Sequence, residues 1–350
     1  ILRRVESVPR IVSAAPGRRP GARDAVSAGR DQRCGYAARM RRHALPAIAL
    51  ALAAALFFTA TYVLNRAMAT AGGHWAWSAS LRYLLTLPLL ALVLPWQGGI
   101  GPVWRALRAH PGPWLLWSGV GFGLFCLCLT WAAASGPSWL VAGTFQLTVI
   151  AGMLLAPLLY RDARARLPKR ALALGLLIVG GIALLQFGHF HGALDRRAWL
   201  ALGSVSLAAF LYPLGNRQIL LHLERSGENL NASQRVFGMT LASQPCWWLV
   251  AAMAAVRVGA PPASQVLLAG GVALFAGTIA TILFFAATGR VRNDPAALGA
   301  VEAMQAAEIL FSTALGALFL HETWPRGWAA AGAWLVVVGI VGLGLLVGRD

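Results

Sequence analysis

The residues best suited to chemistry in this chain are two carboxylates in a largely apolar stretch near its C-terminus. Glu302 and Glu308 share one face of a predicted helix with Gln305 and Ser312, within an arc of about 120° at 100° per residue. A charged side chain at the centre of a membrane costs roughly 3 kcal/mol, so an acid kept there indicates function. Burial stabilises the neutral form of a carboxyl group, which suits proton uptake and release. We expect Glu308, the deeper acid, to exchange a proton or to pair with a cationic substrate, with Glu302 and Gln305 shaping the site.

A structural alternative stays open for both acids. They could form ion pairs with Arg82 or another arginine and hold helices together. Arg82 lies about seven residues inside its predicted helix, where it needs a partner. Arg235 lies at the predicted membrane edge, where we expect its side chain to extend to the lipid headgroups.

A second set of polar candidates recurs in the two halves of the chain. Tyr62 and Asn65, followed by Arg66, reappear as Tyr212 and Asn216, followed by Arg217. These pairs suit a gate or hinge, and equally suit helix capping with arginine at the headgroups. Several aromatic side chains expected in the membrane could stack on a lipophilic cation: Tyr62, Phe122, Phe125, Trp131, Phe145, Trp247 and Trp248.

The elements that must position these residues are membrane helices. The chain has 350 residues, of which 58% are hydrophobic and 12% charged, whereas soluble domains contain about 25% charged residues. Windows of about 20 apolar residues predict ten membrane helices, at 45–66, 75–95, 113–134, 137–160, 170–187, 198–217, 236–257, 264–288, 295–320 and 327–347.

The formal charge of +18 is explained by where the basic residues lie in the chain and does not require an anionic partner. Residues 1–42 contribute eight of these charges and predict a disordered, Arg-rich tail. We expect Met40 to be the natural start of the chain; the rival interpretation is an arm that binds anionic lipid or nucleic acid. From Arg41 onward, Lys and Arg gather in alternate loops, fifteen on one side and five on the other, which predicts that both termini are cytoplasmic and leaves no need for a nucleic-acid partner.

Matched segments at offsets of 151 to 158 residues indicate an internal repeat, with halves at 43–190 and 191–350. Each half has five predicted helices, an odd number, so the second copy must be inverted in the membrane. Inverted repeats are typical of secondary transporters with alternating access. No phosphate-binding loop, nucleophile motif or metal-ligand spacing is present, so we expect neither an enzyme nor a cofactor. A membrane enzyme acting on lipid-linked substrates is the alternative of another class, but it would need clustered acids or histidines, and the histidines are scattered over the sequence.

The ten-helix layout and five-plus-five duplication resemble the drug/metabolite transporter superfamily, in its EamA-like form. The segments Val301–Phe311 and Trp139–Gln146 are similar to its multidrug resistance efflux transporter branch and add Gln146 to the pathway residues. The resemblance covers about 43–348 and implies export of drug-like, amphipathic or cationic compounds, by proton antiport, across the bacterial cytoplasmic (inner) membrane. Amino-acid or other metabolite export is the alternative within the superfamily. Residues 45–64 contain no acid, so the proton-coupling scheme of small multidrug resistance proteins, which uses a carboxylate in the first helix, does not carry over.

Two glycine pairs leave the oligomeric state open between monomer and homodimer. Gly119 with Gly123, and Gly344 with Gly348, have the spacing that lets helices approach closely, within the fold or between copies.

Overall fold

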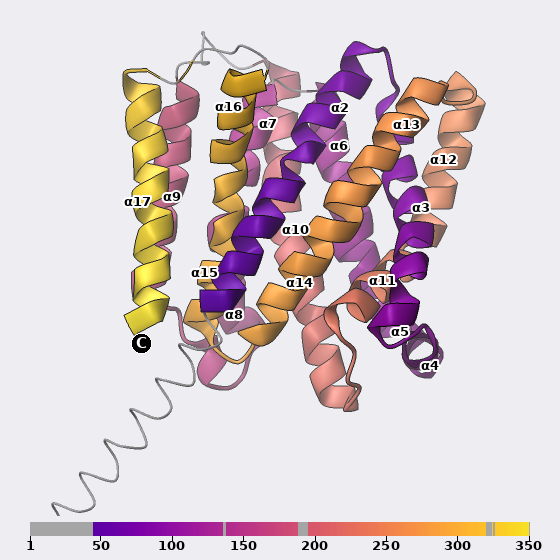
Figure 1. Cartoon of the computed structure of the whole chain (residues 1–350), viewed down its shortest axis with the longest axis horizontal. Helices are drawn as coiled ribbons and strands as arrows, with labels where there is room; N and C mark the ends of the chain where they lie inside the picture. Colours follow the sequence, from indigo (N-terminus) through magenta and orange to yellow (C-terminus); the bar gives the residue numbers. More distant parts are fainter. Residues whose placement is uncertain (1–44, 136–137, 188–194, 320–323, 325, 350) are drawn as a thin grey trace, which may run out of the picture. The chain divides into compact units, whose positions relative to one another are not determined.

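The computed structural model describes residues 45–135, 138–187, 195–319, 324 and 326–349, and these residues form helices without a strand (Figure 1). The chain divides into two units, Ile1–Met40 and Arg41–Asp350. All described residues belong to the second unit. The expected tail at 1–42 and the expected start at Met40 therefore lie outside the described residues.

The helices follow one another with short connections. Residues 45–58 are helical, and the labelled elements after them are α2 (Ala60–Thr70), α3 (Trp75–Val93), α4 (Gly101–Ala109), α5 (Pro111–Ser118), η2 (Gly119–Leu124), α6 (Phe125–Ser135), α7 (Ser138–Phe145), α8 (Thr148–Leu159), α9 (Lys169–Phe187), α10 (Arg196–Ser226), α11 (Ala232–Ala242), α12 (Gln244–Val258), α13 (Ala263–Val272), η4 (Ala273–Ala280), α14 (Thr281–Arg290), α15 (Pro295–Ala303), η5 (Met304–Ala306), α16 (Ala307–Phe319) and α17 (Trp328–Arg349).

The number of helices long enough to cross a membrane differs from the sequence count. Within the described residues, eight helices are long and apolar enough to cross a membrane, or nine if the pair α11 and α12, bent by 46°, is one span. The predicted span at 295–320 is divided into α15, η5 and α16. A hydropathy window averages over such breaks, because it reports composition rather than continuity of hydrogen bonding. The multi-pass helical class is confirmed, and the count of ten is not.

The helix α10 is longer than its apolar window predicts. It begins at an Asp195 cap, whose carboxylate accepts a hydrogen bond from the Ala198 amide at 2.8 Å. It runs for 31 residues to Gly227, whose φ of 72° gives the left-handed conformation that ends helices. Arg217, expected at the end of a helix, is therefore inside one.

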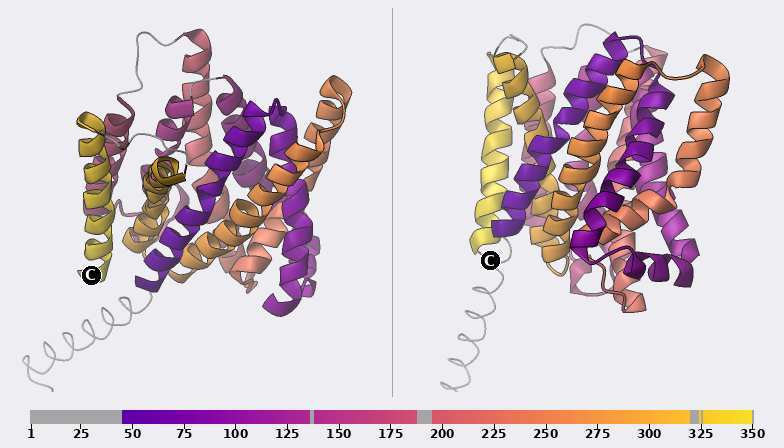
Figure 2. Two further views of the ribbon diagram at one scale, coloured as in Figure 1. Left: turned by 45° about the horizontal axis from the view of Figure 1, so that its top comes forward. Right: turned by 45° about the vertical axis from the view of Figure 1, so that its right-hand side comes forward.

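Helices distant in sequence pair side by side. The helices α9 and α17 pack together, as do α3 and α12, and α8 and α15. The helix α2 packs on α13, and α6 packs on α10. Figures 1 and 2 show α9 beside α17, and α2 beside α13, in every view. Each of these pairs joins one element before residue 190 to one after it.

Glycines allow the closest of these approaches, but not the glycines predicted from spacing. A Cβ on Gly181 of α9 would lie 2.8 Å from the Gly332 carbonyl oxygen of α17, and one on Gly121 of η2 would lie 2.9 Å from the Gly215 Cα of α10. Around Gly119 and Gly344 no other atom lies within 4 Å of such a Cβ. At these two positions the structure shows no close contact within the fold, and contact between copies stays a prediction.

Two π-helical segments, η2 (Gly119–Leu124) and η4 (Ala273–Ala280), each interrupt an α-helix. The first joins α5 to α6, and the second joins α13 to α14. Such segments are rare and widen a helix by one residue, often near functional sites. The larger apolar core lies around them, and a second core lies where α8, α9, α15 and α17 meet.

Candidate functional site

Two helices that the sequence predicts as continuous are each interrupted at a buried glutamine. Gln146 lies between α7 and α8, and Gln305 lies in the 3-10 turn η5 between α15 and α16. At the first break the amides of Val149 and Ile150 donate to carbonyls three residues back, at 3.0 and 3.1 Å. Neither break contains the proline or glycine that ordinarily signals one. Broken helices within membrane proteins are typical of substrate sites.

Polar atoms at and near these breaks have no hydrogen-bond partner among the described residues. They are Nε2 of Gln146, Oε1 of Gln305, and both side-chain polar atoms of Asn216 on α10. All three side chains are almost fully buried, with exposures of 2%, 5% and 2%. Buried polar groups are nearly always hydrogen-bonded. These amides can therefore bind a ligand or water within the helix bundle.

A buried ion pair joins α10 to α15. Arg217 Nε donates to Glu302 Oε1 at 3.0 Å, and Nη2 donates to Oε2 at 2.7 Å. The two side chains are 1% and 2% exposed. Gly152 on α8 makes room for them, because a Cβ there would overlap Glu302 Oε2. The structural alternative considered for the acids thus holds for Glu302, with Arg217 as its partner rather than Arg82.

A second, more exposed ionic cluster lies near the C-terminal end of α10. Arg164, in the turn after α8, pairs with Asp162 at 2.8 Å and with Glu224 at 3.0 Å. Arg292, after α14, lies 3.9 Å from Glu224. Hydrogen bonds from Arg164 lower the pKa of Asp162, and its two acidic partners raise the pKa of Arg164. The cluster ties together the ends of α8, α10 and α14.

Tyr160 connects this cluster to the buried ion pair. Its ring lies 4.5 Å from the Arg164 guanidinium carbon and 6.0 Å from that of Arg217. Tyr160 is 6% exposed. Cations over an aromatic face are attracted to it, so one ring lies between an exposed arginine and a buried one.

Tyr212 is the residue around which the expected site residues gather. It lies on α10, one helical turn before Asn216, so both share a face. Its hydroxyl faces Gln305 and lies close enough to Glu308, Arg82 and Glu302 for electrostatic interaction. Glu308 is 5% exposed. Residues predicted independently from three parts of the sequence are thus brought together.

Aromatic rings pack around Tyr212 and extend across the larger core. Phe125 lies 5.0 Å and Phe284 5.8 Å from the Tyr212 ring. Tyr83 stacks on Trp247 at 4.4 Å. Further contacts at 5.6 to 6.4 Å bring in Phe58, Phe122, Phe145 and Phe285. Of the aromatic residues expected to stack on a cation, Trp131 and Trp248 are 38% and 65% exposed, so they point away from this group.

Arg82 and Arg235, the two arginines placed by sequence in predicted membrane helices or at their edge, both lie inside the bundle. Arg82 lies over the Tyr83 ring at 5.8 Å, and its buried Nε has no hydrogen-bond partner. Arg235 is only 4% exposed and donates to the Phe285 carbonyl. The expectation that Arg235 extends to the headgroups is therefore wrong. Gly289 on α14 leaves the space that its guanidinium fills.

The remaining candidates contribute less to this group. The Ser312 hydroxyl donates to the Ile309 carbonyl on its own helix at 2.9 Å, so its hydrogen bond is already made. Asn65 is half-buried on α2. The side chain of Tyr62 lies outside the described residues.

Sequence reasoning missed Arg217, Tyr160 and Phe284 as members of the site. The sequence predicts Arg217 at the end of a helix, next to the headgroups, although the repeated Asn-Arg pair marks its position. Tyr160 ends an apolar helix and Phe284 lies inside another, so neither shows a local signal. Their roles depend on neighbours distant in the sequence.

The chain matches a family model over residues 45–348; its description reads "EmrE: Putative multidrug resistance efflux transporter". This match confirms the resemblance found in the sequence.

Two relatives extend the comparison without naming a substrate. The chain is 40% identical over 306 residues to "Uncharacterized protein YjlA" of Bacillus subtilis (strain 168), covering 85% of this chain and 94% of that protein. It is 38% identical over 279 residues to the "Uncharacterized 42.1 kDa protein in intracellular alkaline protease 3'region" of Shouchella clausii, covering 78% and 73%. A solved crystal structure shares the fold, with a TM-score of 0.65 at 15% identity over 87% of this chain and 98% of that one.

Proposed function

This chain belongs to the multidrug resistance efflux transporter family, and on that premise we propose that it exports small drug-like organic compounds, amphipathic or cationic, across the bacterial cytoplasmic membrane. The family is one of membrane transporters rather than enzymes, and both relatives come from bacteria. The substrate class rests on the residues around Tyr212.

The observation that carries this proposal is the pair of interrupted helices with buried, unpartnered amides. Gln146, Gln305 and Asn216 offer hydrogen-bonding atoms that no described residue uses. The aromatic rings beside them supply a surface on which a flat or cationic compound can stack. A ligand site with mostly apolar walls and a few polar groups is typical for small organic molecules.

Alternating access is proposed from an inverted repeat of residues 43–190 and 191–350. Three features support two related halves: a π-helical segment in η2 and again in η4, a break at Gln146 and again at Gln305, and helix pairs that join one half to the other. If the two halves exchange conformations, a site between them opens to each side of the membrane in turn.

Glu308 is the proposed proton carrier. Glu302 already shares both its oxygens with Arg217, and protonating it would break a buried ion pair. Glu308 lies close to Tyr212, where a proton and a cationic substrate can compete for one carboxylate. Such competition is the simplest way to couple export of a cation to entry of a proton.

The ionic cluster of Asp162, Arg164, Glu224 and Arg292, with Tyr160 beneath it, is the proposed closure on the cytoplasmic side. The distribution of Lys and Arg over the loops supports this orientation and cytoplasmic termini. Exposed ion pairs are weak individually, so such a closure can open and reform during a cycle.

Export of amino acids or similar metabolites is a second candidate. The buried guanidinium groups of Arg82 and Arg235 favour a substrate with a carboxylate, because arginine binds carboxylates in a bidentate manner.

The test is flux in proteoliposomes with and without an imposed pH gradient, for tetraphenylphosphonium, neutral amphipathic compounds and amino acids. We expect the cation to move with the gradient and Glu308→Gln to abolish the dependence on pH. Asp195→Asn is the matched control, because it also removes one carboxylate while asparagine still caps α10. If only amino acids move, the second candidate replaces the first. If flux ignores both the gradient and Glu308→Gln, the proton-coupling proposal fails.

A further inference from the structure

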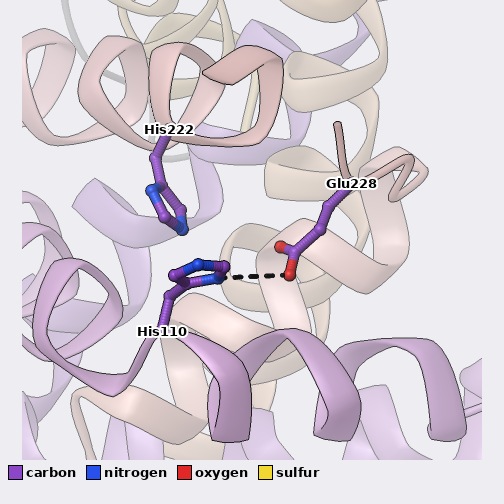
Figure 3. Close-up of side chains that lie close together, drawn as sticks. All are labelled: His110, His222 and Glu228. Atoms are coloured by element: carbon purple, nitrogen blue, oxygen red, sulfur yellow. Dashed lines mark ion pairs between the residues drawn. The ribbon is translucent and has the colours of Figure 1, made fainter. Parts of the chain in front are cut away.

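Two histidines and a glutamate from separate parts of the chain converge at one end of the helix bundle. His110 joins α4 to α5, His222 lies near the end of α10, and Glu228 follows α10. Figure 3 shows the three side chains pointing toward a common space. In the sequence His110 and His222 were counted as scattered; the fold brings their rings to 5.1 Å.

We propose that His110, His222 and Glu228 form a binding site for a divalent transition-metal ion, with Zn²⁺ as the best match. One ligand atom from each residue lies within 4.8 Å of the other two. Two imidazoles and one carboxylate are a donor set that suits Zn²⁺, whereas Mg²⁺ and Ca²⁺ prefer oxygen ligands alone.

The separation of His110 and Glu228 fits a metal site better than a direct hydrogen bond. Their Nδ1 and Oε1 atoms are 3.5 Å apart, whereas an N–H···O bond is usually about 2.9 Å. Two ligand atoms in a tetrahedral zinc site, each about 2.0 to 2.1 Å from the ion, lie roughly 3.4 Å from each other. The other ligand atoms of the cluster lie up to 4.8 Å apart, so they would have to move closer together to bind the ion.

Two further atoms of the cluster are buried and lack partners. His222 Nε2 and Glu228 Oε2 make no hydrogen bond to any described residue. Because buried polar atoms are costly when unpaired, a ligand for them is expected on energetic grounds. A bound cation would satisfy the carboxylate and the imidazole at once.

The site is also accessible. The side chains of His110 and Glu228 are 45% and 21% exposed, so an ion can enter from solvent, and water can fill the fourth position of a three-ligand site. The bound ion would fix the turn between α4 and α5 to the end of α10. His222 lies five residues beyond Arg217 on that helix, so the ion would restrain the same helix that carries the buried ion pair. The site is independent of what the protein transports.

The test is binding of Zn²⁺ alone to the full chain, purified in detergent with a tag free of histidine, by competition with a metal-sensitive dye. We expect one tight equivalent, weakened at least tenfold in His222→Ala and in Glu228→Gln. His74→Asn is the control: it removes an imidazole, and asparagine keeps the cap that His74 provides to α3.

A second measurement needs no variant. Co²⁺ bound to the unaltered protein should give the intense visible absorption of a four-coordinate site, and Zn²⁺ should displace it and raise the thermal unfolding midpoint. Absence of both the tight equivalent and the Co²⁺ spectrum would overturn the proposal. So would Zn²⁺ affinity that is lost in His74→Asn and kept in Glu228→Gln.

Discussion

Removing one partner of the buried pair Arg217–Glu302 is expected to destabilise the protein strongly. Glu302→Gln keeps the shape of the side chain and removes its charge, which leaves a guanidinium buried between α8, α10 and α15. The pair is held by two hydrogen bonds of 3.0 and 2.7 Å. With 1% and 2% exposure, little solvent is available to replace the lost carboxylate.

The magnitude follows from the geometry. For opposite charges about 4 Å apart at an effective dielectric constant of about 20, the interaction is about 4 kcal/mol. Breaking a buried pair by removing one partner costs about 3–5 kcal/mol in measured cases. We therefore expect Glu302→Gln to lower the free energy of unfolding by about 4 kcal/mol.

The assay is reversible unfolding in mixed micelles at increasing denaturing detergent, followed by the change in helix content. The double variant Arg217→Met with Glu302→Leu should recover most of the loss, because no charge is then left buried. Asp162→Asn is the control, since the Asp162 carboxylate is 53% exposed in its pair with Arg164 and such pairs contribute little to stability.

A free energy of unfolding for Glu302→Gln within about 1 kcal/mol of the unaltered protein would show that the buried charge pair contributes little to stability. A double variant no more stable than Glu302→Gln would show that the loss comes from packing rather than from an unpaired charge.

Three further predictions concern other parts of the fold. Gly215→Ala should lower the free energy of unfolding by about 1–3 kcal/mol, because the new methyl group overlaps the backbone of η2. In the same assay Gly344→Ala should not lower the free energy of unfolding, because no neighbouring atom lies where its methyl group would be. Gln305→Ala should reduce substrate flux at least tenfold in the proteoliposome assay, because it removes one of the buried side-chain amides whose oxygen bonds to no described residue. Hydrogen bonds from Arg164 lower the pKa of Asp162. The contribution of the Asp162 carboxylate to the free energy of unfolding should therefore be constant above its ordinary pKa of about 3.9 and be lost only as the pH falls through the lowered pKa. A difference in unfolding midpoint between the unaltered protein and Asp162→Asn that shrinks already near neutral pH would contradict this prediction.

Much of the fold class follows from local composition. Apolar windows locate the membrane helices, because every backbone polar group in lipid must be satisfied within a helix. The acids on the helix after Pro295 are conspicuous for the same reason, since a charge in an apolar stretch is expensive. Glu302, Gln305 and Glu308 are therefore predictable from the sequence, and all three are buried.

Other features depend on packing. Hydropathy treats Arg217 and Arg235 as ends of membrane segments, because it assigns each residue a fixed cost regardless of partners. In the fold Glu302 stabilises Arg217 inside α10 across 85 residues of sequence, and the Phe285 carbonyl and ring accommodate Arg235. The break at Gln146 has no local signal, since no proline or glycine marks it.

By itself, then, the sequence determined that this is a multi-pass helical membrane protein of a transporter family with two acids on one polar face. Tertiary structure decided which charges are paired, where helices are broken, and that His110, His222 and Glu228 meet. The physical reason is that the gain from burying an apolar side chain, and the cost of burying a lone charge, each depend on one residue. The energy of an ion pair, an aromatic contact or a metal site belongs to residues that only the packing of distant helices brings within a few ångströms.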